Sequence, residues 1–144
     1  MKIKLVLLLF AAGCIAIIIT SCQSEGEQMY NRYYTTGTLL YRSHCENCHG
    51  VNGEGLNDLI PSFHDSVYLR KNLGNLPCFI KYGLKAQITV GNKTFTGQQM
   101  PAQGNLTSIE IAEVLTYVTN SFGNKIGLID APKVNNDLAK CDGE

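Results

Sequence analysis

The sequence has no cluster of basic residues, no internal repeat and no long apolar run beyond its N-terminal region. It carries 12 Lys and Arg against 12 Asp and Glu, so its formal net charge is zero. Because neither a basic patch nor an aromatic-laced basic run is present, we exclude a nucleic-acid partner. The absence of repeats excludes a repeat array. The apolar run Leu5–Ile19 is shorter than the roughly 20 residues that a membrane-spanning helix needs.

The first residues have the pattern of an export signal. Lys2 and Lys4 precede the apolar run, and the small residues Thr20 and Ser21 close it. We therefore interpret residues 1–21 as a signal peptide, with an uncleaved anchor as the alternative. Removal of the two lysines leaves a mildly acidic mature chain. The signal predicts an exported, periplasm-facing protein.

Residues 19–22, Ile-Thr-Ser-Cys, resemble a bacterial lipobox, in which the cysteine is lipidated and becomes the first mature residue. Residues 11–14 resemble one too, but the apolar run before Cys14 is short and continues past it, which favours Cys22. Residues 22–28 are polar and lack apolar periodicity, so they predict a flexible tether. The expected result is a lipoprotein that contacts the membrane through its lipid anchor.

Residues 45–49 read C-x-x-C-H, the pattern of covalent c-type haem attachment. The thiols of Cys45 and Cys48 must reach the two vinyl groups of one porphyrin, while the imidazole of His49 meets the iron from the same side. On one helical turn, spacings of three and four residues place all three side chains on one face. A zinc site would need a second Cys/His pair, and a redox C-x-x-C would need a βαβ context. Neither is present, so the single motif predicts one covalent haem c with its iron.

Two crossing helices are predicted around this motif. The first covers residues 29–45, with Tyr33 or Tyr34, Gly37, Leu40, Tyr41 and His44 on one face. Gly37 lowers helix propensity, which indicates a close contact with another helix. The second opens at Thr107 with Glu110 in a capping box. Its expected apolar face comprises Ile111, Val114, Leu115, Val118 and Phe122, and Gly123 is expected to end it.

Smaller elements are predicted between these helices. Asp65 or Ser66 can cap a short helix that runs to Lys71. Another short helix begins with Pro77 and stops at Gly83. Residues 88–96 alternate around a Gly-Asn pair and predict a β-hairpin. Residues 125–144 are expected to form an irregular tail over the domain.

Met100 lies in a polar loop, residues 97–104, without the apolar neighbours of a core methionine. A histidine and a thioether on opposite sides of the iron are a known c-type arrangement with raised potential. Met100 is therefore predicted as the sixth ligand. His44 and His64 are the competitors. His44 is beside the motif on the wrong side of the ring, and His64 is close in sequence to His49, so both are expected at the surface or in a loop.

The remaining cysteines allow one disulfide. Thiols in an oxidising compartment tend to be consumed by chemistry. One cysteine leaves with the signal, Cys22 takes lipid, and Cys45 and Cys48 take haem, which leaves Cys78 and Cys141. An even remainder permits their pairing, and the alternative is a buried thiol and a tail thiol.

From about Gly37 to Asn124 the chain resembles the class I monohaem cytochromes c. The resemblance implies an all-α cytochrome c fold, with three to five helices around one covalent haem and a short β-hairpin, here assigned to residues 29–124. It also implies roles for four further residues: Tyr41 and Tyr117 at the helix crossing with Gly37, Pro61 as the carbonyl that orients His49, and Met100 as sixth ligand.

Residues 41–55, 100–102 and 115–124 look like small cytochrome modules attached to bacterial respiratory enzymes. This resemblance implies one-electron transfer with an oxidase, a nitrite reductase or a dehydrogenase, so that the chain is an electron carrier rather than an enzyme. One alternative is a catalytic or gas-sensing haem protein with a labile sixth ligand. Another is a fixed cytochrome subunit of an oxidase or dehydrogenase complex.

Overall fold

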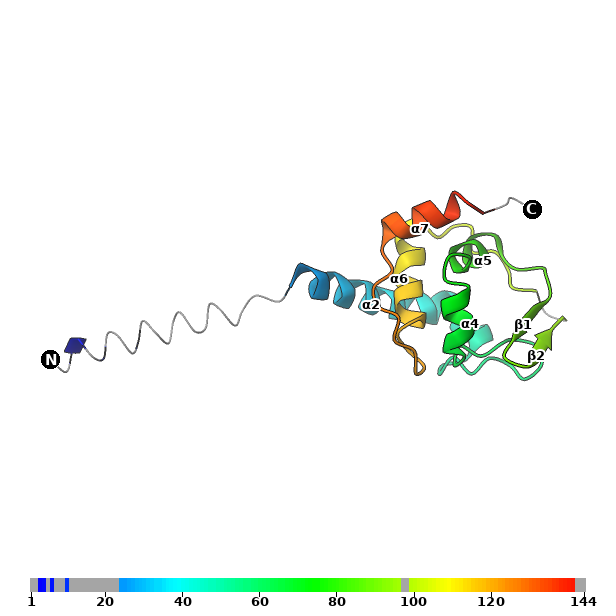
Figure 1. The fold of residues 1–144 in the computed structure, drawn as a ribbon, viewed down its shortest axis with the longest axis horizontal. Helices are drawn as coiled ribbons and strands as arrows, with labels where there is room; N and C mark the ends of the chain where they lie inside the picture. Colours follow the sequence, from blue (N-terminus) through cyan, green and yellow to red (C-terminus); the bar gives the residue numbers. More distant parts are fainter. Residues whose placement is uncertain (1–2, 5, 7–9, 11–23, 97–98, 142–144) are drawn as a thin grey trace.

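The computed structural model describes residues 3–4, 6, 10, 24–96 and 99–141 (Figure 1). The predicted signal peptide is thus described only at residues 3, 4, 6 and 10, and both lipidation candidates, Cys14 and Cys22, lie outside the described residues. Within the described ranges, no helix combines the length and the hydropathy needed to cross a membrane. The named elements are α2 (Glu25–His44), α3 (Glu46–His49), α4 (Ser66–Lys71), α5 (Leu76–Tyr82), β1 (Ile88–Val90), β2 (Lys93–Phe95), α6 (Ser108–Val118) and α7 (Ala131–Leu138).

Helix α2 begins earlier than expected. The Ser24 hydroxyl accepts a hydrogen bond from the backbone N–H of Glu27 at 3.3 Å, and the acidic residues Glu25 and Glu27 favour a helix start. Residues 25–28 of the predicted flexible tether are therefore helical, and residues 22 and 23 lie outside the described residues. Figure 1 shows these first turns of α2 extending away from the other helices.

The crossing of α2 and α6 is confirmed, and it explains Gly37. A Cβ at this position would lie 2.0 Å from the backbone oxygen of Glu113 and 2.9 Å from the Cβ of Tyr117. Only glycine permits the two helix backbones to approach this closely. The predicted capping box at the start of α6 is also present: the N–H of Thr107 donates to the Glu110 carboxylate at 2.8 Å, and the Thr107 hydroxyl accepts from the N–H of Glu110 at 3.4 Å.

The prediction that α6 reaches Phe122 is wrong. The helix ends at Val118, and Phe122 adopts a left-handed conformation with φ +57°. The reason lies in Asn120, whose side-chain oxygen accepts hydrogen bonds from the N–H groups of Ile126 and Gly127 at 3.1 and 2.7 Å. These bonds fold the chain back on itself just beyond the helix end.

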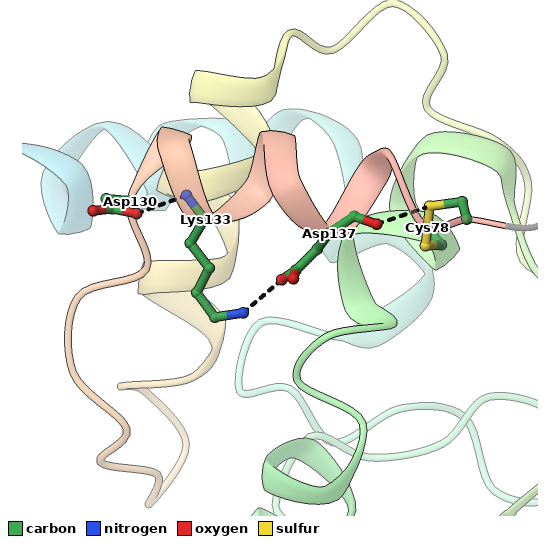
Figure 2. A network of polar contacts seen from close by, with 5 residues as sticks. Cys78, Asp130, Lys133 and Asp137 are labelled. Carbon is green, nitrogen blue, oxygen red and sulfur yellow. Dashed lines mark hydrogen bonds and ion pairs between the residues drawn. A yellow bond between two sulfur atoms is a disulfide. The ribbon is translucent and has the colours of Figure 1, made fainter.

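The expectation of an irregular tail is also wrong in part, because α7 lies within it. The carboxylate of Asp130 caps this helix by accepting from the N–H of Lys133 at 2.9 Å, and Val134 is completely buried. Cys141, just beyond α7, forms a disulfide with Cys78 of α5, with an S–S distance of 2.05 Å (Figure 2). With α7 included, the described chain has six helices rather than three to five.

The smaller elements agree with their sequence signals. The Asp65 carboxylate accepts from two N–H groups at the start of α4, each at 3.0 Å. Helix α5 carries Pro77 in its first turn and ends at Tyr82, with Gly83 as its C-cap at φ +78°. Strands β1 and β2 form the predicted antiparallel hairpin. The architecture is mostly helical with one small sheet, which confirms the predicted fold class.

Candidate functional site

A cavity of about 400 Å³ lies among α3, α4, α5, the hairpin and α6. Five residues predicted to attach, bind or orient the cofactor line it: Cys45, Cys48, His49, Pro61 and Met100. Most of the remaining wall is apolar and includes Leu69, Leu76, Phe79, Ile80, Val114, Leu115 and Val118. A mostly apolar cavity with a few specific donor groups is the usual form of a cofactor site.

The attachment motif is positioned by the end of α2. The N–H of Cys45 donates to the carbonyl of Tyr41 at 2.8 Å, and the N–H of His49 donates to the carbonyl of Cys45 at 2.9 Å. This single turn holds both thiols and the imidazole at the same cavity. Burial, with a smaller contribution from the neighbouring Cys48, raises the pKa of Cys45 to about 11. Its thiol therefore stays protonated at neutral pH.

His49 is buried and neutral. Burial lowers the pKa of the His49 imidazole to about 4, and hydrogen bonding by the backbone of Pro61 opposes this shift only in part. Nδ1 of His49 is buried, and no atom of the described residues meets the distance and angle of a hydrogen bond to it. The contact with the backbone of Pro61 is therefore a weak one. A neutral imidazole is the form that binds a metal ion.

The loop after His49 folds back tightly. The Tyr41 hydroxyl donates to the carbonyl of Gly50 at 2.6 Å, and the N–H of Gly55 donates to the carbonyl of His49 at 2.8 Å. Gly55 has φ +69°, and a Cβ there would lie 2.3 Å from the carbonyl oxygen of Ile60. This tight loop brings Pro61 beside His49.

Sequence reasoning missed an aromatic layer behind His49. The ring of Phe63 stacks on the imidazole with centroids 4.2 Å apart, and Phe122 stacks on Phe63 at 6.2 Å. Asn124 holds this layer, because its amide donates to the carbonyl of Phe63 at 2.8 Å. The sequence signal was weak, since Phe63 lies in a loop and Phe122 continued the apparent helix face.

Met100 reaches the cavity from a loop that is paired to the end of α5. Its N–H and carbonyl bond to the carbonyl and N–H of Leu84 at 3.0 and 2.9 Å. The competing histidines are both exposed, as expected. His44 lines the cavity, and its Nδ1 lies 3.3 Å from the side-chain oxygen of Gln103. His64 does not line it, and its Nε2 lies 2.9 Å from the carbonyl of Asn52.

Residues 32–118 match the family described as cytochrome C oxidase, cbb3-type, subunit III. The chain belongs to this c-type cytochrome family. The match covers more than half of the chain and includes the attachment motif. No curated protein matches the chain. The apolar cavity, its two thiols and its buried neutral imidazole fit a covalent haem c, which Cys45, Cys48 and His49 would hold.

Membership in the family identifies the chain as a class I-like monohaem cytochrome c. Its cofactor is one covalently bound haem c with iron, and its general function is electron transfer by that haem. The iron supplies a reversible one-electron couple. The protein contributes the ligands, their orientation and the dryness of the surroundings, and these set the potential.

Proposed function

We propose that this cytochrome is a membrane-tethered electron carrier whose iron is bound by His49 and Met100. The observation that carries the proposal is that these two residues and both motif cysteines line one apolar cavity. If both residues bind the iron, no position is left for a substrate. The thioether raises the potential, and the stacked ring of Phe63 holds the imidazole of His49 in one orientation.

The proposed cellular setting follows from the N-terminal sequence. Proteins with covalent haem c are typically exported to the periplasm. The lipobox-like residues before Cys22 support a lipid anchor there. Such an anchor would raise the local concentration of the cytochrome near its partner, so a weak and short-lived contact suffices for electron transfer.

The family description favours an oxidase over a nitrite reductase or dehydrogenase as the partner. It also supports a second candidate function, a fixed subunit of an oxidase complex. Purification from native membranes with mild detergent decides between them. Stable co-migration with an oxidase identifies a subunit, whereas migration as a single lipid-anchored protein identifies a carrier. The variant Cys22→Ser then tests the anchor, because loss of the lipid should release a carrier into the soluble fraction.

The two ligand positions can be tested with one pair of variants. We expect His49→Ala to prevent accumulation of stable holoprotein, because the haem loses its ligand on the attachment side. We expect Met100→Ala to keep the covalent haem but to lower the potential and let carbon monoxide bind the reduced iron rapidly. Optical spectra and a potential titration provide the measurements.

The wild-type protein is the control for these spectra. A sulfur-to-iron charge-transfer band in its oxidised form, lost in Met100→Ala, supports the assignment. A wild-type protein that lacks the band and binds carbon monoxide rapidly would instead favour a catalytic or gas-sensing haem. If Met100→Ala changes neither spectrum nor potential, another residue is the sixth ligand.

A further inference from the structure

The ammonium group of Lys81 makes two short hydrogen bonds to the loop that follows Met100. Its Nζ donates to the carbonyl of Gly104 at 2.7 Å and to the carbonyl of Leu106 at 2.8 Å. Hydrogen bonds from a charged donor are shorter and stronger than those between neutral groups. Lys81 therefore fixes the far end of the methionine loop, which has no helix of its own between Met100 and Leu106.

The residues around Lys81 contact the rest of the same loop. The carbonyl of Ile80 accepts from the N–H of Gln103 at 2.8 Å. At Gly83 the backbone passes so close that a Cβ would lie 2.5 Å from the carbonyl oxygen of Met100. With the Leu84 pairing, residues 80–84 bind the loop at its start, middle and end.

Helix α5 itself is held in place on two sides. Leu76 and Ile80 are buried and line the cavity wall. On the other side, Cys78 is joined through the disulfide to Cys141 beyond α7 (Figure 2). Lys81 thus connects the methionine loop to a helix that has little freedom to move.

We propose that Lys81 is a positioning residue for the Met100 ligand, an inference that rests on the proposed function. Lys81 does not touch the haem iron. It holds the carbonyls of Gly104 and Leu106 so that the preceding loop keeps the Met100 thioether at the cavity. Without the ammonium group, the loop adopts other positions more often, and the fraction of molecules with sulfur bound to iron falls.

Exogenous imidazole measures this fraction, because it binds the oxidised iron only when the sixth position is free. Oxidised holoprotein of wild type and of Lys81→Ala is titrated with imidazole and followed at the charge-transfer band. We expect the apparent Kd for imidazole to fall about tenfold, as the loss of two charged hydrogen bonds would produce. The variant Lys81→Arg, which keeps a cationic donor, should stay near wild type.

The matched control is Lys71→Ala, which removes an exposed lysine from α4 that has no hydrogen bond to the methionine loop among the described residues. It should titrate like wild type. If Lys81→Ala gives too little holoprotein, Lys81→Leu keeps the apolar stem and removes the same charge. Thermal unfolding of each variant separates a ligand effect from general destabilisation. An unchanged imidazole Kd in Lys81→Ala, or an equal shift in Lys71→Ala, overturns the inference.

The variant Met100→Ala distinguishes failure of this inference from failure of the proposed function. If Met100→Ala loses the band and Lys81→Ala titrates like wild type, the ligand assignment stands and the role of Lys81 is refuted. If Met100→Ala keeps the band and the wild-type Kd, Met100 is not the ligand and both proposals fail together. A tighter Kd in both variants, with Lys81→Arg near wild type, supports both.

Discussion

The two sides of the haem cavity are built by different means. On the His49 side, the attachment motif, the tight loop to Pro61 and the ring of Phe63 come from one short stretch of chain, and stacked aromatic rings fill the space behind the imidazole. On the Met100 side, segments distant in sequence are joined by backbone hydrogen bonds, a lysine and a disulfide. The attachment and ligand residues of the first side come from one local stretch, with Phe122 and Asn124 supporting them from a distant segment. On the second side, the position of Met100 itself depends on connections between separate segments.

Removal of the disulfide on the Met100 side is expected to have the largest effect on stability, and it tests the difference between the two sides. The double variant Cys78→Ser and Cys141→Ser opens a loop whose ends are 63 residues apart. By chain entropy we expect the free energy of unfolding to fall by about 4 kcal/mol. Urea denaturation of the holoprotein measures this change.

We also expect the double variant to keep its covalent haem and its charge-transfer band in the folded state, with tighter imidazole binding. Replacing both cysteines avoids a lone thiol that could pair between molecules. An unchanged free energy of unfolding would show that the disulfide adds no stability to the Met100 side.

A smaller effect is expected at the helix crossing that supports the His49 side. The change Gly37→Ala places a methyl group 2.0 Å from the backbone oxygen of Glu113, so the helices must separate. Overpacking of this kind typically costs about 1–3 kcal/mol. Gly26→Ala on the same helix is the matched control, since a Cβ there meets nothing within 4 Å. Thermal melting should show a loss for Gly37→Ala and a slight gain for Gly26→Ala, and equal melting temperatures would contradict the crossing.

The smallest effect that we expect is the difference in stability between two variants, each of which replaces one phenylalanine on one side of the cavity. Phe63→Leu removes ring stacking on His49, whereas Phe79→Leu removes similar apolar area from α5, where no ring pair is found in the described part of the chain. Aromatic pairs add about 0.5–1.5 kcal/mol beyond the area they bury. We therefore expect Phe63→Leu to be the more destabilising by about 1 kcal/mol in urea titrations. Equal losses would mean that stacking adds no stability behind His49.

The sequence alone predicted the structure correctly where a local pattern of residues determines it. The C-x-x-C-H motif needs only one helical turn, the capping box needs only Thr107 and Glu110, and Gly37 signals a close approach whatever its partner. Helix α7 was missed, although Asp130 as a cap and a proline in the first turn are a helix-start signal, because its apolar face is short.

Other features could not be read from sequence because they depend on contacts between distant segments. The residues near Asn120 do not indicate that its side-chain oxygen accepts a hydrogen bond from the N–H of Gly127, and so they do not predict the early end of α6. The position of Lys81 against Gly104 and Leu106 likewise exists only once α5 and the methionine loop have come together. Spacing along the chain carries no information about such pairings.

The disulfide also determines how the molecule responds to a cut in its chain. Cys78 and Cys141 lie on opposite sides of the exposed turn between β1 and β2. Proteolysis at that turn would give two pieces, one with the haem-bearing Cys45 and Cys48 and the other with Met100. The sulfur bridge would keep the two pieces in one covalent molecule, so a nicked cytochrome would retain both sets of haem contacts until a reductant separates them.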